Sequence, residues 1–224
     1  MKTKIDNITA KQYGIDAGAV VVGIADANDF HPAPDGFRPS DILEGCRSVI
    51  VLGVPFPKEA LSMQAPAYTE LRNAMLTNMT EIAKKVVKRI QADGYQTKAI
   101  SASGGRTIDG KHWGHISLKH AAELAGLGRI NRNYLLTNDR YGNLLWFSAV
   151  LTDAALVPDE KAQYMACDNC GKCVQACPSG ALDTPGAFGK KECARFFKII
   201  NKKLEIQCFA CRAACPYRFG LPTQ

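Results

Sequence analysis

Eight of the nine cysteines in this chain of 224 residues lie in its last quarter, between Cys167 and Cys215. Crowding of this kind indicates a segment held together through its sulfurs, by disulfides or by metal. No apolar run follows the basic start of the sequence, so we expect no secretory leader, no membrane insertion and a cytoplasmic location. Because the cytoplasm keeps thiols reduced, metal binding is the better interpretation.

The first cysteine run has the pattern C-x2-C-x2-C-x3-C followed by Pro178. This spacing is typical of two-cluster 4Fe–4S proteins, in which the fourth cysteine binds the other cluster. Thiolates two residues apart on a curled loop can each reach a different iron of one cubane. Pro178 then turns the chain away, so the fourth cysteine is expected to point to a second site. The cysteines of this run are Cys167, Cys170, Cys173 and Cys177.

A complementary run consists of Cys193 and then Cys208, Cys211 and Cys215. The same crossover returns Cys215 to the first site, which fills two sites with no cysteine of the segment left over. Cys193 is the weakest ligand, because a helix-like stretch from Ala194 to Lys203 separates it from Cys208; a buried structural thiol is the alternative. The prediction is one cluster on Cys167, Cys170, Cys173 and Cys215, and another on Cys177, Cys193, Cys208 and Cys211.

Two other interpretations of the segment fit less well. Structural zinc normally uses two cysteine pairs separated by a long spacer, and a disulfide scaffold requires an oxidising compartment.

The formal net charge of +7 falls to roughly +3 if two oxidised clusters with their thiolates carry about −2 each. Partial compensation of the cluster charge, a solvated helix face or an RNA-binding patch would explain the basic residues of the segment: Lys190, Lys191, Arg195, Lys198, Lys202 and Lys203.

The part of the chain before the cysteine segment alternates between helix-like and strand-like stretches. A long amphipathic helix containing Met75, Met79, Ile82, Val86 and Ile90 is predicted to end near Asp93. The pattern indicates a layered α/β or α+β domain over residues 1–157, followed by a domain over residues 158–224. We also predict a helix at Ile8–Ala17 and strands at Val20–Ala25, Ser48–Pro55, Thr97–Ala102 and Leu144–Thr152.

Glycines and histidines mark the candidate sites in this first part. Gly126 suits the end of a helix over 116–124, and Gly128 two residues later suggests that something packs against the backbone. Gly104 and its neighbour Gly105 form a turn or approach a ligand. Three histidines surround Trp113 and are either ordinary surface groups or a proton donor or axial ligand beside a cofactor: His112, His115 and His120.

The stretch from Leu118 to Asn133, LKHAAELAGLGRINRN, resembles the epoxyqueuosine reductase and corrinoid reductive dehalogenase superfamily. So do the segments 138–142 and 149–153, the early run at 17–25 with 48–53, and the cysteine segment, in the same order along the chain. The resemblance covers almost the whole sequence and describes a short form of such proteins.

The resemblance implies a nitroreductase-like cobalamin-binding domain followed by a bacterial-ferredoxin-like domain with two 4Fe–4S clusters, an α+β protein overall. Single electrons would pass through the clusters to cobalamin, and an electron donor protein of the ferredoxin or flavodoxin type would supply them. A corrinoid protein or tRNA is a further candidate partner. The residues nearest the corrin ring would be Gly126, Leu127, Gly128 and Asn131.

The sequence departs from this pattern at one functional position. Epoxyqueuosine reductases carry an acid in an Asp-Thr-Gly-Pro stretch, where this chain has GKHWGHIS over 110–117. His112 and His115 are therefore the candidate proton donors. The prediction is an iron–sulfur oxidoreductase of unassigned substrate. The alternatives are a ferredoxin-type electron carrier without a cofactor in its N-terminal part and a non-redox module with structural clusters.

Overall fold

The computed structural model describes residues 2–108, 111–200 and 203–222. Within these ranges, only the backbone is described at residues 107, 111, 112, 203 and 204. In the part of the chain so described, no helix is both long enough and apolar enough to cross a membrane.

Two compact units make up the chain. The first combines Met1–Pro55, Leu76–Gly128 and Trp146–Gln163, and the second combines Phe56–Met75, Arg129–Leu145 and Tyr164–Gln224. The expected boundary between residues 157 and 158 stays a prediction about domains. The stretches Phe56–Met75 and Arg129–Leu145 precede that boundary in the sequence but pack with the cysteine segment. Hydrogen bonds join both stretches to it.

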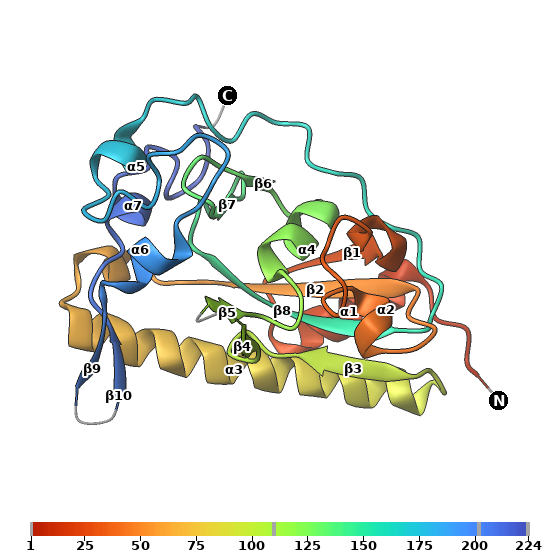
Figure 1. Ribbon diagram of the computed structural model, residues 1–224. Helices are drawn as coiled ribbons and strands as arrows, with labels where there is room; N and C mark the ends of the chain where they lie inside the picture. The colour runs from red at the N-terminus through yellow and green to blue at the C-terminus, as the bar shows by residue number, and fades with distance from the viewer. Residues whose placement is uncertain (1, 109–110, 201–202, 223–224) are drawn as a thin grey trace. The chain divides into compact units, whose positions relative to one another are not determined.

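A four-stranded sheet organises the first unit, with strand order β1-β2-β8-β3 (Figure 1). β1 pairs antiparallel with β2, and β3 pairs antiparallel with β8. β2 and β8 are the two central strands, and each has six consecutive buried residues. The predicted strands are confirmed within two residues: β1 is Val21–Asp26, β2 Ser48–Pro55, β3 Thr97–Ile100 and β8 Leu145–Thr152.

Helices α1 (Asn7–Ala17) and α3 (Ala65–Ala92) supply the main core with the sheet. The predicted apolar stripe of α3 is confirmed over its second half, where Met79, Ile82 and Val86 are buried together with Ile24 and Ile50 of the sheet. The Asp6 side chain caps α1 by accepting a hydrogen bond of 2.8 Å from the backbone N–H of Thr9. Burial of one helix face is what a 3.6-residue apolar period produces.

Helix α4 (Leu118–Leu124) packs on β1 and β2. A side chain at Gly23 of β1 would meet the carbonyl of Ala125 and the side chain of Leu127, so the end of this helix lies directly on the strand. The first unit therefore consists of a four-stranded sheet with helices packed against it. Its remaining elements are η1 (Ala27–Phe30), α2 (Pro39–Ile42), β4 (Arg106–Ile108) and β5 (Lys111–Trp113).

Short elements form the second unit. The expected helix over Ala194–Lys203 is wrong: a helix ends at Ala194, and β9 (Phe197–Ile200) then pairs antiparallel with β10 (Lys203–Ile206). The run Phe-Phe-Lys-Ile-Ile is rich in aromatic and β-branched residues, which favour strands. The other elements are η2 (Lys58–Ser62), β6 (Arg129–Ile130), β7 (Leu136–Thr137), α5 (Lys172–Gln175), α6 (Lys190–Ala194) and α7 (Ala210–Ala213).

Candidate metal centre

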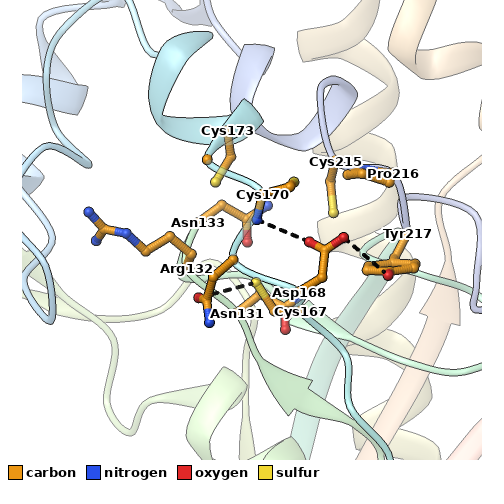
Figure 2. Close-up of a pocket in the computed structure, with 12 residues that line it drawn as sticks. Asn131, Arg132, Asn133, Cys167, Asp168, Cys170, Cys173, Cys215, Pro216 and Tyr217 are labelled. Atoms are coloured by element: carbon orange, nitrogen blue, oxygen red, sulfur yellow. Dashed lines mark hydrogen bonds between the residues drawn. The ribbon is translucent and has the colours of Figure 1, made fainter.

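Four cysteines line one cavity of about 320 Å³, a volume that includes its part open to solvent. Three of them come from the first cysteine run, and α5 begins between the second and the third. The fourth follows α7 from the far end of the second run. Figure 2 shows their side chains around one space. The cavity thus brings together Cys167, Cys170, Cys173 and Cys215.

Asp168 joins the two runs at this first cavity. Its carboxylate accepts a hydrogen bond of 3.1 Å from the backbone N–H of Cys170 and one of 3.4 Å from the hydroxyl of Tyr217 (Figure 2). The bond from Cys170 is the main reason why the pKa of Asp168 lies below its usual value. Because Tyr217 follows Cys215 by two residues, this carboxylate ties the first loop to the end of the second run.

The other four cysteines line a second cavity of about 350 Å³, measured in the same way. Its wall also contains apolar residues, among them Leu182, Phe188 and Phe196. One sulfur, that of Cys177, lies 3.5 Å from the hydroxyl oxygen of Ser179. The cysteines of this cavity are Cys177, Cys193, Cys208 and Cys211.

Burial opposes the ionisation of three of these eight thiols. Burial raises the pKa of Cys211 to about 11, and burial together with neighbouring thiols raises the pKa of Cys173 and Cys215. Four thiolates around one space repel each other unless cations replace their protons. Iron bound in a cubane supplies that positive charge, so the donor set and its distribution over two cavities fit two 4Fe–4S clusters.

A cubane differs from a single ion in how its ligands are spread. Among the residues that the structure describes, no three His, Cys, Asp or Glu side chains are grouped closely enough to hold one metal ion. Ligands of a cubane bind four different corners, so they surround a volume instead of converging on a point. The cysteine-lined cavities are therefore the relevant feature.

The loop Asn131–Asn133 braces both cysteine runs from within the same unit. The side-chain amide of Asn131 donates to the carbonyl of Ala166, at 2.6 Å, directly before Cys167. The Asn133 amide donates to the carbonyl of Cys211 at 3.2 Å, and the Arg132 guanidinium donates to that of Leu182 at 2.7 Å. The sequence analysis missed Arg132 and Asn133; the signal was three donor-rich residues in succession beside the glycine motif.

A buried cation is the second feature that the sequence did not reveal. Arg212 is only 8% exposed and follows Cys211 directly. Its guanidinium donates to the carbonyl of Asn143, and the Asn143 amide returns a hydrogen bond of 3.2 Å to the carbonyl of Arg212. Burial lowers the pKa of Arg212 from its ordinary high value. A positive charge in this place offsets the negative charge that thiolates and sulfide bring to the second cavity.

Two residues of the predicted cofactor loop, Gly126 and Asn131, make contacts within the protein. Gly126 follows the C-cap of α4 with φ +73°, and the backbone bonds from its N–H to Glu123 and from Leu127 to Ala122 form a Schellman motif. A side chain at Gly126 would also meet the carbonyl of Glu160. Asn131 lies in the second unit, where its amide is engaged as described above. Leu127 is 9% exposed, and Gly128 has φ +155°.

The three histidines have different surroundings. His115 is exposed, with its ring beside Gly104. His120 Nδ1 lies 2.6 Å from the hydroxyl of Ser117, and burial is the main cause of its lowered pKa. His112 lies on β5, but its side chain is outside the described residues, as are Asp109 and Gly110. The catalytic assignment of His112 and His115 stays a prediction.

Two cavities, each lined by four cysteines in a crossed combination, define the class as an iron–sulfur protein with a ferredoxin-like segment. Comparison with a family model agrees: the 4Fe-4S binding domain matches residues 163–183. The resemblance inferred from the sequence is also confirmed, since the chain is similar to proteins named epoxyqueuosine reductase and contains a match to a 4Fe-4S binding domain.

Curated relatives support this statement. The epoxyqueuosine reductase of Bacillus subtilis is 31% identical over 120 residues, which cover 48% of this chain and 30% of that protein. That of Lactococcus garvieae is 23% identical over 201 residues, 82% of this chain and 55% of the relative. The chain therefore spans about half the length of such relatives, or less.

Solved structures share the fold. Epoxyqueuosine reductase from Streptococcus thermophilus has a TM-score of 0.65 at 19% identity, covering 97% of this chain and 68% of that one. A catabolic reductive dehalogenase has a TM-score of 0.71 at 22% identity, covering 94% and 31%. Other neighbours are an epoxyqueuosine reductase with an epoxyqueuosine-modified tRNA stem loop, and a reductive dehalogenase whose structure suggests a mechanism for B12-dependent dehalogenation.

Proposed function

We propose that this protein is an iron–sulfur oxidoreductase that passes single electrons through two 4Fe–4S clusters. Cys167, Cys170, Cys173 and Cys215 would hold one cluster, and Cys177, Cys193, Cys208 and Cys211 the other. The observation that carries the proposal is the crossed lining of the cavities, in which the last cysteine of each run joins the opposite group. This is the arrangement expected when each x3-C-P cysteine reaches across to the other cluster.

The test is the metal content of protein reconstituted anaerobically with iron and sulfide. We expect about eight irons and about eight acid-labile sulfides per chain, because each cubane holds four of each. A Cys46→Ser variant is the matched control and should retain the full content, since Cys46 lies in the first unit, outside both cavities. Saturation at four irons, or bound zinc without labile sulfide, would contradict the proposal.

The proposed electron acceptor is cobalamin, held by a nitroreductase-like layered domain. Support comes from the shared fold and from the reductive dehalogenase neighbour for which B12-dependent dehalogenation is described. Gly126, Leu127, Gly128 and Asn131 would border the corrin, whose cobalt would supply the reductive chemistry. The exposed imidazole of His115 would deliver a proton in place of the family's acid.

Absorption spectra test the cobalamin step. Hydroxocobalamin added to the anaerobic holoprotein should give a saturable spectral change, which a Gly128→Leu substitution should weaken at least about tenfold. A Gly45→Ala variant serves as the control, since a side chain at Gly45 would enter open space. Absence of a spectral change in the wild type would leave the clusters in place and remove cobalamin from the proposal.

A second candidate function is that of an electron carrier with no cofactor in the first unit. It is favoured by the engagement of the predicted loop within the protein, where Gly126 meets Glu160 and Asn131 donates to Ala166. The same hydroxocobalamin titration separates the two functions, because a carrier would hold its clusters without binding the corrin.

The proposed substrate is a modified nucleoside in tRNA, by likeness to the relatives named epoxyqueuosine reductase and the neighbour with a bound tRNA stem loop. An epoxyqueuosine-containing stem loop should bind more tightly than the same stem loop without the modification. Equal binding of the two would remove this substrate. A cytoplasmic location, expected from the sequence, stays a prediction.

A further inference from the structure

The β9–β10 hairpin presents large apolar side chains to solvent. All four residues of β9 are exposed, and the exposed fractions are 40% for Phe197, 71% for Ile199 and 43% for Ile200. In the described part of the chain, these two strands form a sheet of their own. Apolar side chains gathered on a surface are typical of a site where another molecule binds.

The base of this hairpin belongs to the second cavity. Phe196, directly before β9, and Cys208, two residues after β10, both line that cavity. The backbone N–H of Gln207 donates to the carbonyl of Phe196 at 2.8 Å and closes the base. The N–H of Ile206 donates to the Thr69 hydroxyl at 2.9 Å and fixes β10. Figure 1 shows the hairpin extending away from α6 and α7.

The charge around the exposed strand is positive. The segment 190–206 contains six basic residues against two acidic ones, a net charge of +4. Lys198 lies between Phe197 and Ile199 on β9, and both Lys191 and Arg195 just before it are exposed. Because side chains alternate along a strand, Phe197 and Ile199 project from one face of the hairpin and Lys198 and Ile200 from the other, so the hairpin surface combines apolar side chains with a basic surround. Its complement is a partner surface that is acidic with an apolar centre.

A protein partner fits this surface better than a nucleic acid does. Bases stack on aromatic rings and on guanidinium planes, and two of the three exposed apolar side chains, Ile199 and Ile200, are aliphatic. Aliphatic side chains instead pack well in the desolvated centre of a protein interface, where a basic rim gives a salt-dependent association rate.

We propose that the surface formed by Phe197, Lys198, Ile199 and Ile200 docks a small acidic electron-carrier protein, which reduces the cluster of the second cavity. One electron leaves the reduced carrier and enters that cluster, so each carrier loses one electron for each cluster reduced and no atom is transferred. The hairpin that carries this surface begins at Phe196 and ends two residues before Cys208, both of which line the second cavity, so a docked carrier is connected to that cluster through the base of the hairpin. The inference rests on the proposed clusters.

The experiment compares reduction by a carrier with reduction by a small molecule. Holoprotein of measured iron content is mixed anaerobically with reduced flavodoxin, and bleaching of the cluster absorbance is followed in a stopped-flow instrument. Dithionite replaces flavodoxin in the parallel arm. The variants are Lys198→Glu and Ile199→Ser, and the matched controls are Lys88→Glu and Ile8→Ser, which change an exposed lysine and an isoleucine that is 79% exposed in the first unit.

We expect each hairpin variant to slow reduction by flavodoxin at least about tenfold, with the dithionite rate and the iron content unchanged. Lys198→Glu should also weaken the dependence of the flavodoxin rate on salt. Wild-type rates in both variants would overturn the proposal, as would a wild type that dithionite reduces and flavodoxin does not.

Binding of RNA or of a second copy of the chain to this surface would give different results with the same variants. Loss of tRNA stem-loop binding, or a change from dimer to monomer, with an unaltered flavodoxin rate would assign the surface to RNA or to a second copy and overturn the proposal. A protein without about eight irons would instead contradict the proposed function itself, so the two failures are distinguishable.

Discussion

Cys215 completes a cavity whose other three cysteines lie within one short loop far back in the sequence. Its position beside Cys211 would place it with the second group if neighbours in sequence shared a cluster. Packing decides otherwise, because Cys211 lies within α7 whereas Cys215 follows the end of that helix. The assignment of ligands can therefore be tested by finding which cysteine substitutions remove the same cluster.

Double substitutions provide that test. We expect Cys215→Ser to lower the iron content from about eight to about four per chain. Adding Cys167→Ser should cost no further iron, because both residues serve one cluster, whereas adding Cys208→Ser should remove the rest. Non-additivity of this kind identifies residues that act together. Iron and sulfide assays check it, and further loss on adding Cys167→Ser would contradict the crossover.

Cys46 differs from the eight other cysteines in its environment. It is half-buried, its sulfur lies 3.6 Å from the carbonyl of Ser48, and burial raises its pKa to about 11. Since this value exceeds that of an unfolded cysteine, about 8.5, its contribution to stability is full below pH 8.5 and is lost as the pH rises towards 11.

Alkylation of the holoprotein should follow this titration. With the other cysteines bound to iron, we expect Cys46 to react with iodoacetamide much more slowly at pH 8 than a cysteine peptide does, and faster as the pH approaches 11. Mass spectrometry gives the extent of labelling, and a Cys46→Ser variant measures the background. Labelling at pH 8 at the rate of the peptide would show that the thiol is not held in its neutral form.

At the scale of elements, the junction after α4 shows why a glycine motif has more than one explanation. Gly126 adopts φ +73° and lies against the carbonyl of Glu160, so its lack of a side chain serves both a helix end and a close chain crossing. Gly45 adopts a similar φ of +71° with open space around it. A comparison of the two positions therefore separates the energetic cost of backbone strain from the cost of a close contact.

Alanine substitutions at these glycines should therefore have different costs. We expect Gly126→Ala to lower the free energy of unfolding by about 3 kcal/mol, from strain together with the clash at Glu160. Gly45→Ala should cost about 1 kcal/mol, from strain alone. Anaerobic urea denaturation followed by circular dichroism measures both. Equal costs would mean that the chain near Glu160 moves aside freely.

For the whole molecule, the two compact units depend on different sources of stability. The first buries an apolar core in which Ile24, Ile50 and Val86 have no exposed surface. The cysteine segment of the second folds into helices of four and five residues and a two-stranded hairpin. Isolated helices of that length are unstable in water, so cluster binding must supply much of the folding free energy there.

Removal of iron should consequently unfold one unit before the other. In apoprotein prepared with a chelator, we expect amides of 164–215 to lose most of their protection from hydrogen exchange, while those of β1 and β2 keep theirs. Exchange monitored by mass spectrometry on the same protein with and without iron makes the comparison. Retained protection over the cysteine segment in the apoprotein would show that its packing suffices without clusters.

Part of this protein is determined by sequence alone. Cysteine spacing predicts two groups of four thiols, since ligand reach along a loop is a local property. Apolar periodicity predicts α3, because burial of one face imposes a period of 3.6 residues, and short apolar runs predict the sheet strands, of which β2 is buried at six consecutive residues. The family resemblance, confirmed by the comparisons, arises from the same local motifs.

Tertiary structure decided the remainder, because it depends on contacts between distant segments. Only the fold places Arg212 in a buried position beside the second cavity and makes Asn133 a donor to Cys211. The helix expected over Ala194–Lys203 is instead β9 and the first residue of β10, because aromatic and β-branched residues pair better as strands. Pairing between strands is non-local, so a linear pattern does not contain the partner that makes it stable.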